Sequence, residues 1–209
     1  MKTEQIYVNG DEASTIKALE NASEFSSESR LSPKNGRRVR LITEELLGMM
    51  RGLAGEYEAM FWIEGDATAC QVHLTAKTAM DSAKRSDLIA ASSSGKNAKA
   101  VGIMGKIRNL VEIGIQSFDE SMKLTEEYGT MAIPFYEYGF NNYSSTASAA
   151  AVWSLANYKA AVEQQQEAGE AEAAEAWDEL EKSVIANVAD DIQVGIRKDT
   201  VEMVVLKKF

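Results

Sequence analysis

The stretch that decides the fold is RRVRLITEELLGMMRGLAGEY, residues 37–57. Its apolar side chains recur every three or four positions, which is typical of an amphipathic helix with one face turned to a core. They are Val39, Leu41, Ile42, Leu46, Met49, Met50 and Leu53. Charged residues fill most of the other positions, so the stretch predicts a long helix that covers one face of another layer.

The sequence before this helix predicts a strand and a second helix. Residues 4–10 (EQIYVNG) alternate toward an Asn-Gly turn, which favours a short strand. Residues 13–25 (ASTIKALENASEF) carry apolar positions at helical spacing, with Asp11 or Ser14 as the cap. Residues 26–38 (SSESRLSPKNGRR) are polar and contain Pro33, so they predict a loop.

The sequence after the helix predicts a β-hairpin and then a further helix. Phe61, Trp62 and Ile63 form a short apolar strand, and residues 69–76 alternate in a way that favours its partner. Residues 80–100 are small, polar and basic, which indicates a loop. VGIMGKIRNLVEIGI, residues 101–115, returns to helical spacing.

The remaining chain is alanine-rich and predicts helices followed by a second hairpin. Within residues 144–188 we expect two antiparallel helices that meet near Gly169. The side chains expected to face inward are Val152, Leu155, Trp177, Leu180, Val184 and Ile185. Alternation in residues 192–205 about Lys198-Asp199 predicts two closing strands. The whole order favours a two-layer α/β sandwich, with a mostly antiparallel sheet, helices on one face and a helical insertion.

Composition and charge narrow the function classes. The 209 residues are 45% hydrophobic and 26% charged, and the formal net charge is −10. Such an acidic chain disfavours a sequence-independent hold on nucleic acid or on an anionic membrane, but it permits a basic protein partner. Cys70 is the only cysteine, and no window reaches the roughly 18 apolar residues of a spanning helix. We therefore expect a cytoplasmic protein without an internal disulfide.

The order of these motifs resembles the histidine kinase-like ATPase (GHKL, or Bergerat) fold, and most closely its anti-sigma factor serine kinase branch. RLITEELLGMMRGLAG resembles the helix that carries the family's N-box, Glu-x-x-x-Asn, with Glu45 on the glutamate of that box. VGIMGKIRNLVE resembles the family's glycine-rich helix start, beginning at Gly102. The resemblance implies an ATPase-like domain over residues 1–116 and 190–209, with residues 117–189 as an inserted helical segment packed on it.

Two positions depart from the nucleotide-binding motifs of that family. The N-box asparagine, which holds Mg²⁺ in the family, is replaced by Met49. A thioether is a poor ligand for this hard cation. The family's Asp-x-Gly-x-Gly motif, whose aspartate recognises adenine, is missing after the second hairpin strand, and Asp81 is the nearest carboxylate. Both departures point to a decayed or remodelled nucleotide site.

Other candidate site residues match part of the family's phosphate-binding and catalytic chemistry. Gly102 and Gly105 would let a backbone approach phosphates at a helix N-terminus, although Gly105 is one residue out of the family spacing. Lys96 could add positive charge. The resemblance assigns Glu45 the role of general base. The alternative for Glu45 is a solvated or ion-paired glutamate beside Arg40 or Arg51.

Three hypotheses for function remain open. The first is a regulatory protein-binding module that acts like an anti-sigma or partner-switching factor, with a sigma factor or an anti-anti-sigma-like regulator as partner and no bound cofactor. The second is an active ATP- and Mg²⁺-binding protein, an ATP-dependent serine kinase, that uses the noncanonical residues above. The third is a homo-oligomer, for example a homodimer, that assembles through residues 144–188. No metal-ligand motif is visible, and His73, the only histidine, is typical of a structural residue.

Overall fold

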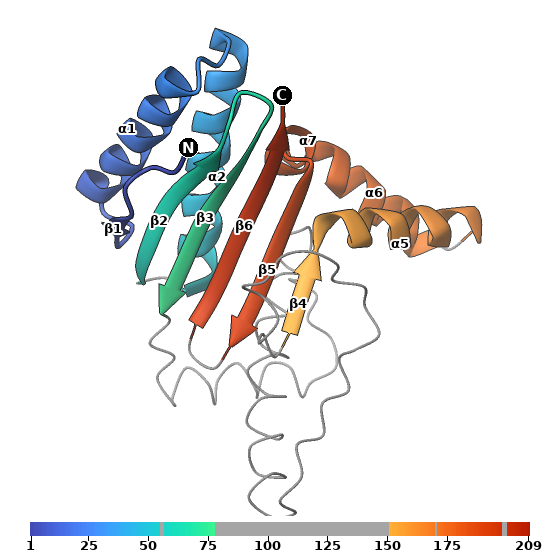
Figure 1. The fold of residues 1–209 in the computed structure, drawn as a ribbon. Helices are drawn as coiled ribbons and strands as arrows, with labels where there is room; N and C mark the ends of the chain where they lie inside the picture. Colours follow the sequence, from blue (N-terminus) through green and yellow to red (C-terminus); the bar gives the residue numbers. More distant parts are fainter. Residues whose placement is uncertain (55–56, 78–150, 170, 198–199) are drawn as a thin grey trace, which may run out of the picture.

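The computed structural model describes residues 1–54, 57–77, 151–169, 171–197 and 200–209. Six strands and five helices lie in this part of the chain (Figure 1). The strands are β1 (Ile6–Val8), β2 (Glu58–Gly65), β3 (Ala69–Lys77), β4 (Ala151–Ser154), β5 (Asp191–Arg197) and β6 (Thr200–Lys208). The helices are α1 (Glu12–Glu28), α2 (Pro33–Ala54), α5 (Leu155–Glu167), α6 (Ala171–Lys182) and α7 (Val184–Val188).

The strands form one antiparallel sheet in the order β1-β2-β3-β6-β5-β4. The β2–β3 hairpin turns at Gly65, whose φ of +145° and close approach to the Ala69 carbonyl leave no room for a side chain. Asp66 closes this turn by accepting hydrogen bonds from the backbone N–H and hydroxyl of Thr68. Both predicted hairpins are therefore confirmed, and β6 joins them by pairing with β3.

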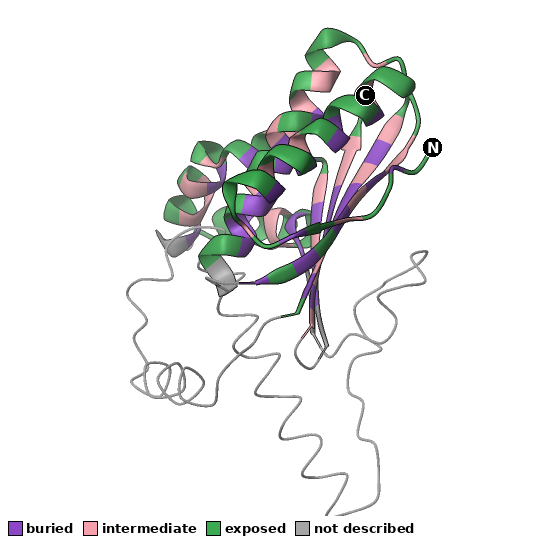
Figure 2. Cartoon of the chain, turned by 90° about the vertical axis from the view of Figure 1, so that its left-hand side faces the viewer, coloured by how far each residue is buried: buried purple, intermediate pink, exposed green. Residues whose placement is uncertain are grey.

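The helices lie on one face of the sheet, and the buried residues lie where the two layers face each other (Figure 2). These residues form one hydrophobic core. Alternation along the strands turns one set of residues, such as Phe61 and Val72, toward the helices. The largest side chains in this core are Phe25, Ile42, Leu46, Met50, Phe61, Ile63, Leu74, Leu155, Ile192 and Met203. The structure is thus a two-layer α/β sandwich with an antiparallel sheet, as the sequence predicts.

Local capping explains where the first two helices begin. Asp11 caps α1 by accepting a hydrogen bond from the Ser14 backbone N–H at 2.6 Å. The predicted loop at residues 26–38 is wrong, because α1 continues to Glu28 and α2 already begins at Pro33. Proline is well placed in the first helical turn, where its missing N–H has no helical partner to lose.

The segment expected to be purely helical contributes a strand to the sheet. Residues 151–154 form β4, which pairs with β5, so the expectation of helix there is wrong. The two predicted helices follow as α5 and α6, and Gly169 lies between them with a φ of +80°. The boundary of the predicted insertion at residues 117–189 stays a prediction.

Most of the inward positions predicted for these helices agree with the structure. Leu155, Leu180 and Ile185 are buried, and Trp177 is half-buried against the core. Val184 is the exception at 46% exposed. The reason is that α6 ends at Lys182 and Ser183 caps a new short helix, which breaks the helical spacing. The side chain of Val152 lies outside the described residues.

None of the helices in the described ranges is both long enough and apolar enough to cross a membrane.

Candidate functional site

The predicted catalytic residue, Glu45, and the predicted cofactor-binding residue, Met49, lie one turn apart on α2. Glu45 is half-buried, whereas Met49 is 5% exposed and belongs to the hydrophobic core. The neighbours Leu46 and Met50 are also buried, so this stripe of α2 faces the sheet and the other helices. Met49 therefore contributes packing at the position where the resemblance places a metal-binding asparagine.

The charged residues predicted as partners of Glu45 have other partners. Arg40 pairs with Glu44 through an Nε–Oε1 distance of 3.2 Å, one turn along the helix. Arg51 instead donates to the backbone carbonyl of Gly10 at 2.5 Å, which ties the end of α2 to the turn after β1. Neither arginine is shown to pair with Glu45. Arg40 forms its ion pair with the adjacent residue, Glu44.

The other predicted site residues are Asp81, Lys96, Gly102 and Gly105, and all four lie outside the described residues. The described elements still show where that part of the chain is attached. Lys77 at the end of β3 and Ala151 at the start of β4 lie at the end of the sheet where α2 also ends (Figure 1). β3 therefore ends, and β4 begins, at the same end of the sheet as the C-terminus of α2.

A second group of polar side chains lies on the sheet face away from the helices. His73 in β3 lies directly opposite Trp62 in β2, and the two rings stack with centroids 4.6 Å apart and planes 5° apart. His73 is only 7% exposed. Both of its ring nitrogens, and Nε1 of Trp62, are buried without a well-aligned hydrogen bond to any of the described residues.

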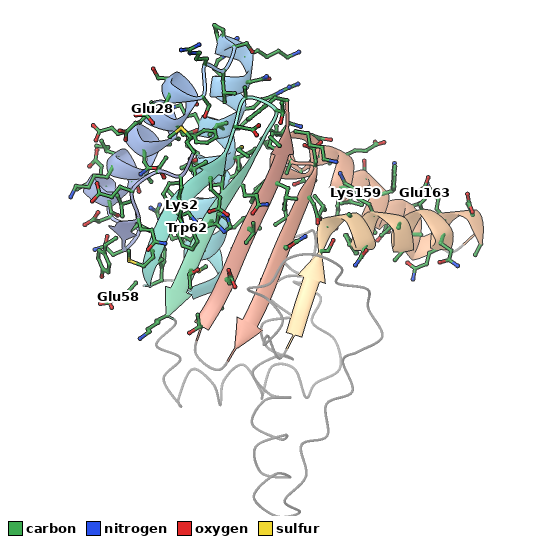
Figure 3. The ribbon with its side chains drawn as sticks, in the orientation of Figure 1. Lys2, Glu28, Glu58, Trp62, Lys159 and Glu163 are labelled. Carbon is green, nitrogen blue, oxygen red and sulfur yellow. The ribbon has the colours of Figure 1, made fainter. Side chains whose placement is uncertain are left out.

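Two charged residues complete this group, which we call the Trp62–His73 cluster (Lys2, Trp62, Glu64 and His73). Glu64 Oε1 lies 3.3 Å from His73 Nε2, and Glu64 Oε2 lies 3.6 Å from Lys2 Nζ. The Lys2 ammonium is also 5.1 Å from the centre of the Trp62 ring, and Figure 3 shows the two side by side on the sheet. Burial lowers the pKa of His73, and Lys2 acts in the same direction, while Glu64 opposes them.

A shallow hollow of about 490 Å³ lies at the opposite end of the sheet from the end of α2. It is formed around the β2–β3 turn and the end of β6, with Glu64, Asp66, Gln71 and Lys208 among its polar lining residues. Cys70 lines its floor, and burial raises the pKa of this thiol to about 12. The hollow does not coincide with the site predicted from the resemblance.

Within the described ranges, no three His, Cys, Asp or Glu side chains are grouped closely enough to hold a metal ion. The sequence predicts His73 to be a hydrogen-bonded structural residue on a strand; the strand is confirmed, but the ring has no well-aligned hydrogen bond within the described part of the chain. The pairing of Trp62 with His73 follows from a hairpin whose last pair is Gly65 with Cys70, which leaves residues 66–69 in the turn. The position of Lys2 could not be predicted from the sequence, because its pairing with Glu64 joins two segments that no local pattern connects.

Comparisons of the chain with protein-family models, with curated proteins and with solved structures find no match.

Proposed function

We propose that this protein is a regulatory protein-binding module, built on a histidine kinase-like ATPase scaffold whose nucleotide site has decayed or been remodelled. It would act like an anti-sigma or partner-switching factor, with a sigma factor or an anti-anti-sigma-like regulator as its partner. The support is the combination of the motif order with an antiparallel sheet that carries its helices on one face.

The observation that carries the proposal is the burial of Met49. At 5% exposed, its side chain is part of the core, and an asparagine there would bury an amide among apolar neighbours. A thioether held in a core cannot supply the hard oxygen ligand that Mg²⁺ requires. Loss of this ligand removes the bridge between helix and phosphates that the resemblance implies for an active member.

Calorimetric titration of the full chain with ATP and Mg²⁺ tests the proposal. We expect no binding tighter than about 1 mM, a threshold that corresponds to about −4 kcal/mol. A micromolar isotherm would instead favour the alternative, an active ATP-binding protein related to serine kinases. Glu45→Gln and Gly102→Ala variants would then show whether the predicted residues hold the nucleotide, with Glu44→Gln as the matched control on the same helix.

The hairpin of α5 and α6 offers a surface for the protein partner. Leu155 and Leu180 anchor it in the core, while its outer part carries exposed carboxylates such as Glu163, which points into solvent in Figure 3. Residues 155–182 contain eight acidic side chains and two lysines. A partner with a basic surface fits this end of the molecule by charge.

A variant that changes Glu163, Glu167 and Glu175 to glutamine tests this surface. All three side chains are exposed, so the folded structure should keep its stability within about 0.5 kcal/mol. Binding to a purified sigma factor or anti-anti-sigma-like protein should weaken and should lose much of its salt dependence. Glu12, Glu20 and Glu24 on α1 provide a matched control, because their replacement removes the same charge from another exposed surface.

A further inference from the structure

The Trp62–His73 cluster contains one buried group, His73, that can take up a proton as the pH falls. His73 is the only histidine in the chain, and no side chain of the described residues accepts or donates a well-aligned hydrogen bond to its ring. Buried polar atoms normally have well-aligned hydrogen bonds, and three atoms without one among the described residues, in a single stacked pair, call for an explanation. A group held in this way responds strongly to any charge that is placed beside it.

The charged neighbours of His73 come from each segment packed against it. On β2 the carboxylate of Glu64 lies 3.3 Å away, and it also faces Lys2 from the segment before β1. On β6 Val204 lies opposite His73, and Glu202 follows on the same face two residues away. Burial raises the pKa of Glu202. On β3 itself Lys77 lies four residues further along that face.

Lys2 and the His73 imidazole therefore share two partners, the Glu64 carboxylate and the Trp62 ring. While His73 is neutral, Lys2 is the positive group that the described part of the chain places at both partners. Once His73 takes a proton, it becomes a second cation beside the same carboxylate and the same ring. Two cations that compete in this way weaken each other's attachment, and the weakening is reciprocal by linkage.

We propose that His73 is a proton-operated switch that sets how firmly the segment around Lys2 is held on the sheet. With His73 neutral, Glu64 and Trp62 hold Lys2, and the backbone of Thr3 pairs with Ile63. With His73 protonated, Glu64 turns to the imidazolium, and the segment before β1 loses the anchor that Lys2 provides, while Thr3 Oγ1 still accepts from the Ile63 N–H. The switch is independent of the proposed function, because it uses the sheet face that carries no helix of the described residues.

Nuclear magnetic resonance of the full chain tests this directly, since one histidine gives one imidazole titration. In the Lys2→Met variant we expect the titration midpoint of His73 to rise by about half a pH unit, the size expected for coupling between partly exposed charges. In Glu64→Gln the midpoint should fall. Lys17→Met and Glu58→Gln remove the same charges from exposed positions elsewhere and should leave the midpoint unchanged.

The second readout is the mobility of the segment itself. As the pH is lowered through the His73 titration of the wild-type protein, the ¹⁵N heteronuclear Overhauser effects of the Lys2 and Thr3 amides should decrease. In His73→Phe they should stay constant over the same pH range. The proposal is overturned if Lys2→Met leaves the His73 midpoint where it was, if these amides keep their values throughout, or if the chain unfolds before His73 takes a proton.

Discussion

The Ser154 hydroxyl donates a hydrogen bond to Asp191 Oδ1 at 3.0 Å, where β4 passes into α5. The same carboxylate oxygen accepts from the backbone N–H of Ala156 at 3.0 Å, in the first turn of α5. Ser154 in turn caps α5 by accepting from the Asn157 N–H. One side chain at the start of β5 thus fixes both the edge strand and the helix that follows it.

Replacing Asp191 with alanine should therefore destabilise the protein by about 1–3 kcal/mol, because it leaves the Ser154 hydroxyl and the Ala156 N–H without their acceptor. Asp191→Asn keeps an oxygen acceptor at this position and should cost distinctly less. Chemical denaturation of the two variants gives the comparison. Equal losses would show that the negative charge, and not the acceptor, matters here.

The packing of Met49 makes a second prediction. Met49→Ala should lower the free energy of unfolding by about 2–5 kcal/mol, as for other large-to-small changes in a core. Met49→Asn should also destabilise the protein and should not create Mg²⁺-dependent ATP binding. Denaturant titration and calorimetry measure the two effects. A stable Met49→Asn variant that binds ATP with Mg²⁺ would mean that only one ligand separates this chain from an active site.

The stability of the protein should depend on pH through His73. Because burial lowers the pKa of His73 below 6.5 in the folded state, the unfolded chain takes up the proton first as the pH falls. This contribution to stability is complete above pH 6.5 and is lost progressively below it, until the folded state is protonated as well. Unfolding free energies measured from pH 7.5 downward should show this decline.

His73→Phe serves as the control for that decline. Phenylalanine keeps a ring to stack on Trp62 and removes two buried nitrogens that have no well-aligned hydrogen bond to any of the described residues. The variant should be at least as stable as the wild type at pH 7.5, and the part of the decline due to His73 should disappear. An unchanged pH profile would assign the decline to other groups.

Cys70 should be unreactive in the folded protein. It is 2% exposed, and its pKa of about 12 keeps the thiol protonated at any ordinary pH. A thiol reagent such as Ellman's reagent should therefore label one cysteine per chain in denaturant and almost none in buffer at pH 8. Rapid labelling of the native protein would show that Cys70 becomes exposed to solvent in the folded state.

Much of the architecture could be predicted because hydrophobic spacing carries it. The spacing of apolar residues in α2, and their alternation in β2, β3, β5 and β6, predict which face of each element is buried. The structure buries those faces. The α1–α2 loop was predicted too long, since Pro33 was interpreted as a loop residue although it lies in the first turn of α2. Its position relative to the next apolar residue, Val39, allows both interpretations.

The features that could not be predicted depend on pairing between distant segments. β4 is only four residues long, and it is a strand because β5 lies beside it. The alanine-rich sequence around it has the opposite local preference. The Trp62–His73 cluster likewise needs Lys2, which the sheet brings to Glu64. Of the predicted nucleotide site, only Glu45 and Met49 lie in the described residues, so the site itself stays a prediction.

The position of β6 in the sheet has a consequence for how the chain is made. β6 lies between β3 and β5, although residues 78–199 separate it from β3 in sequence. During synthesis from the N-terminus, β3 must therefore wait with one unpaired edge until residues 200–208 have left the ribosome. Sheets that close through such distant contacts fold slowly, and an exposed edge invites association with other chains. The edge of β3 that later pairs with β6 is therefore the place where we expect the unfinished chain to associate with other chains.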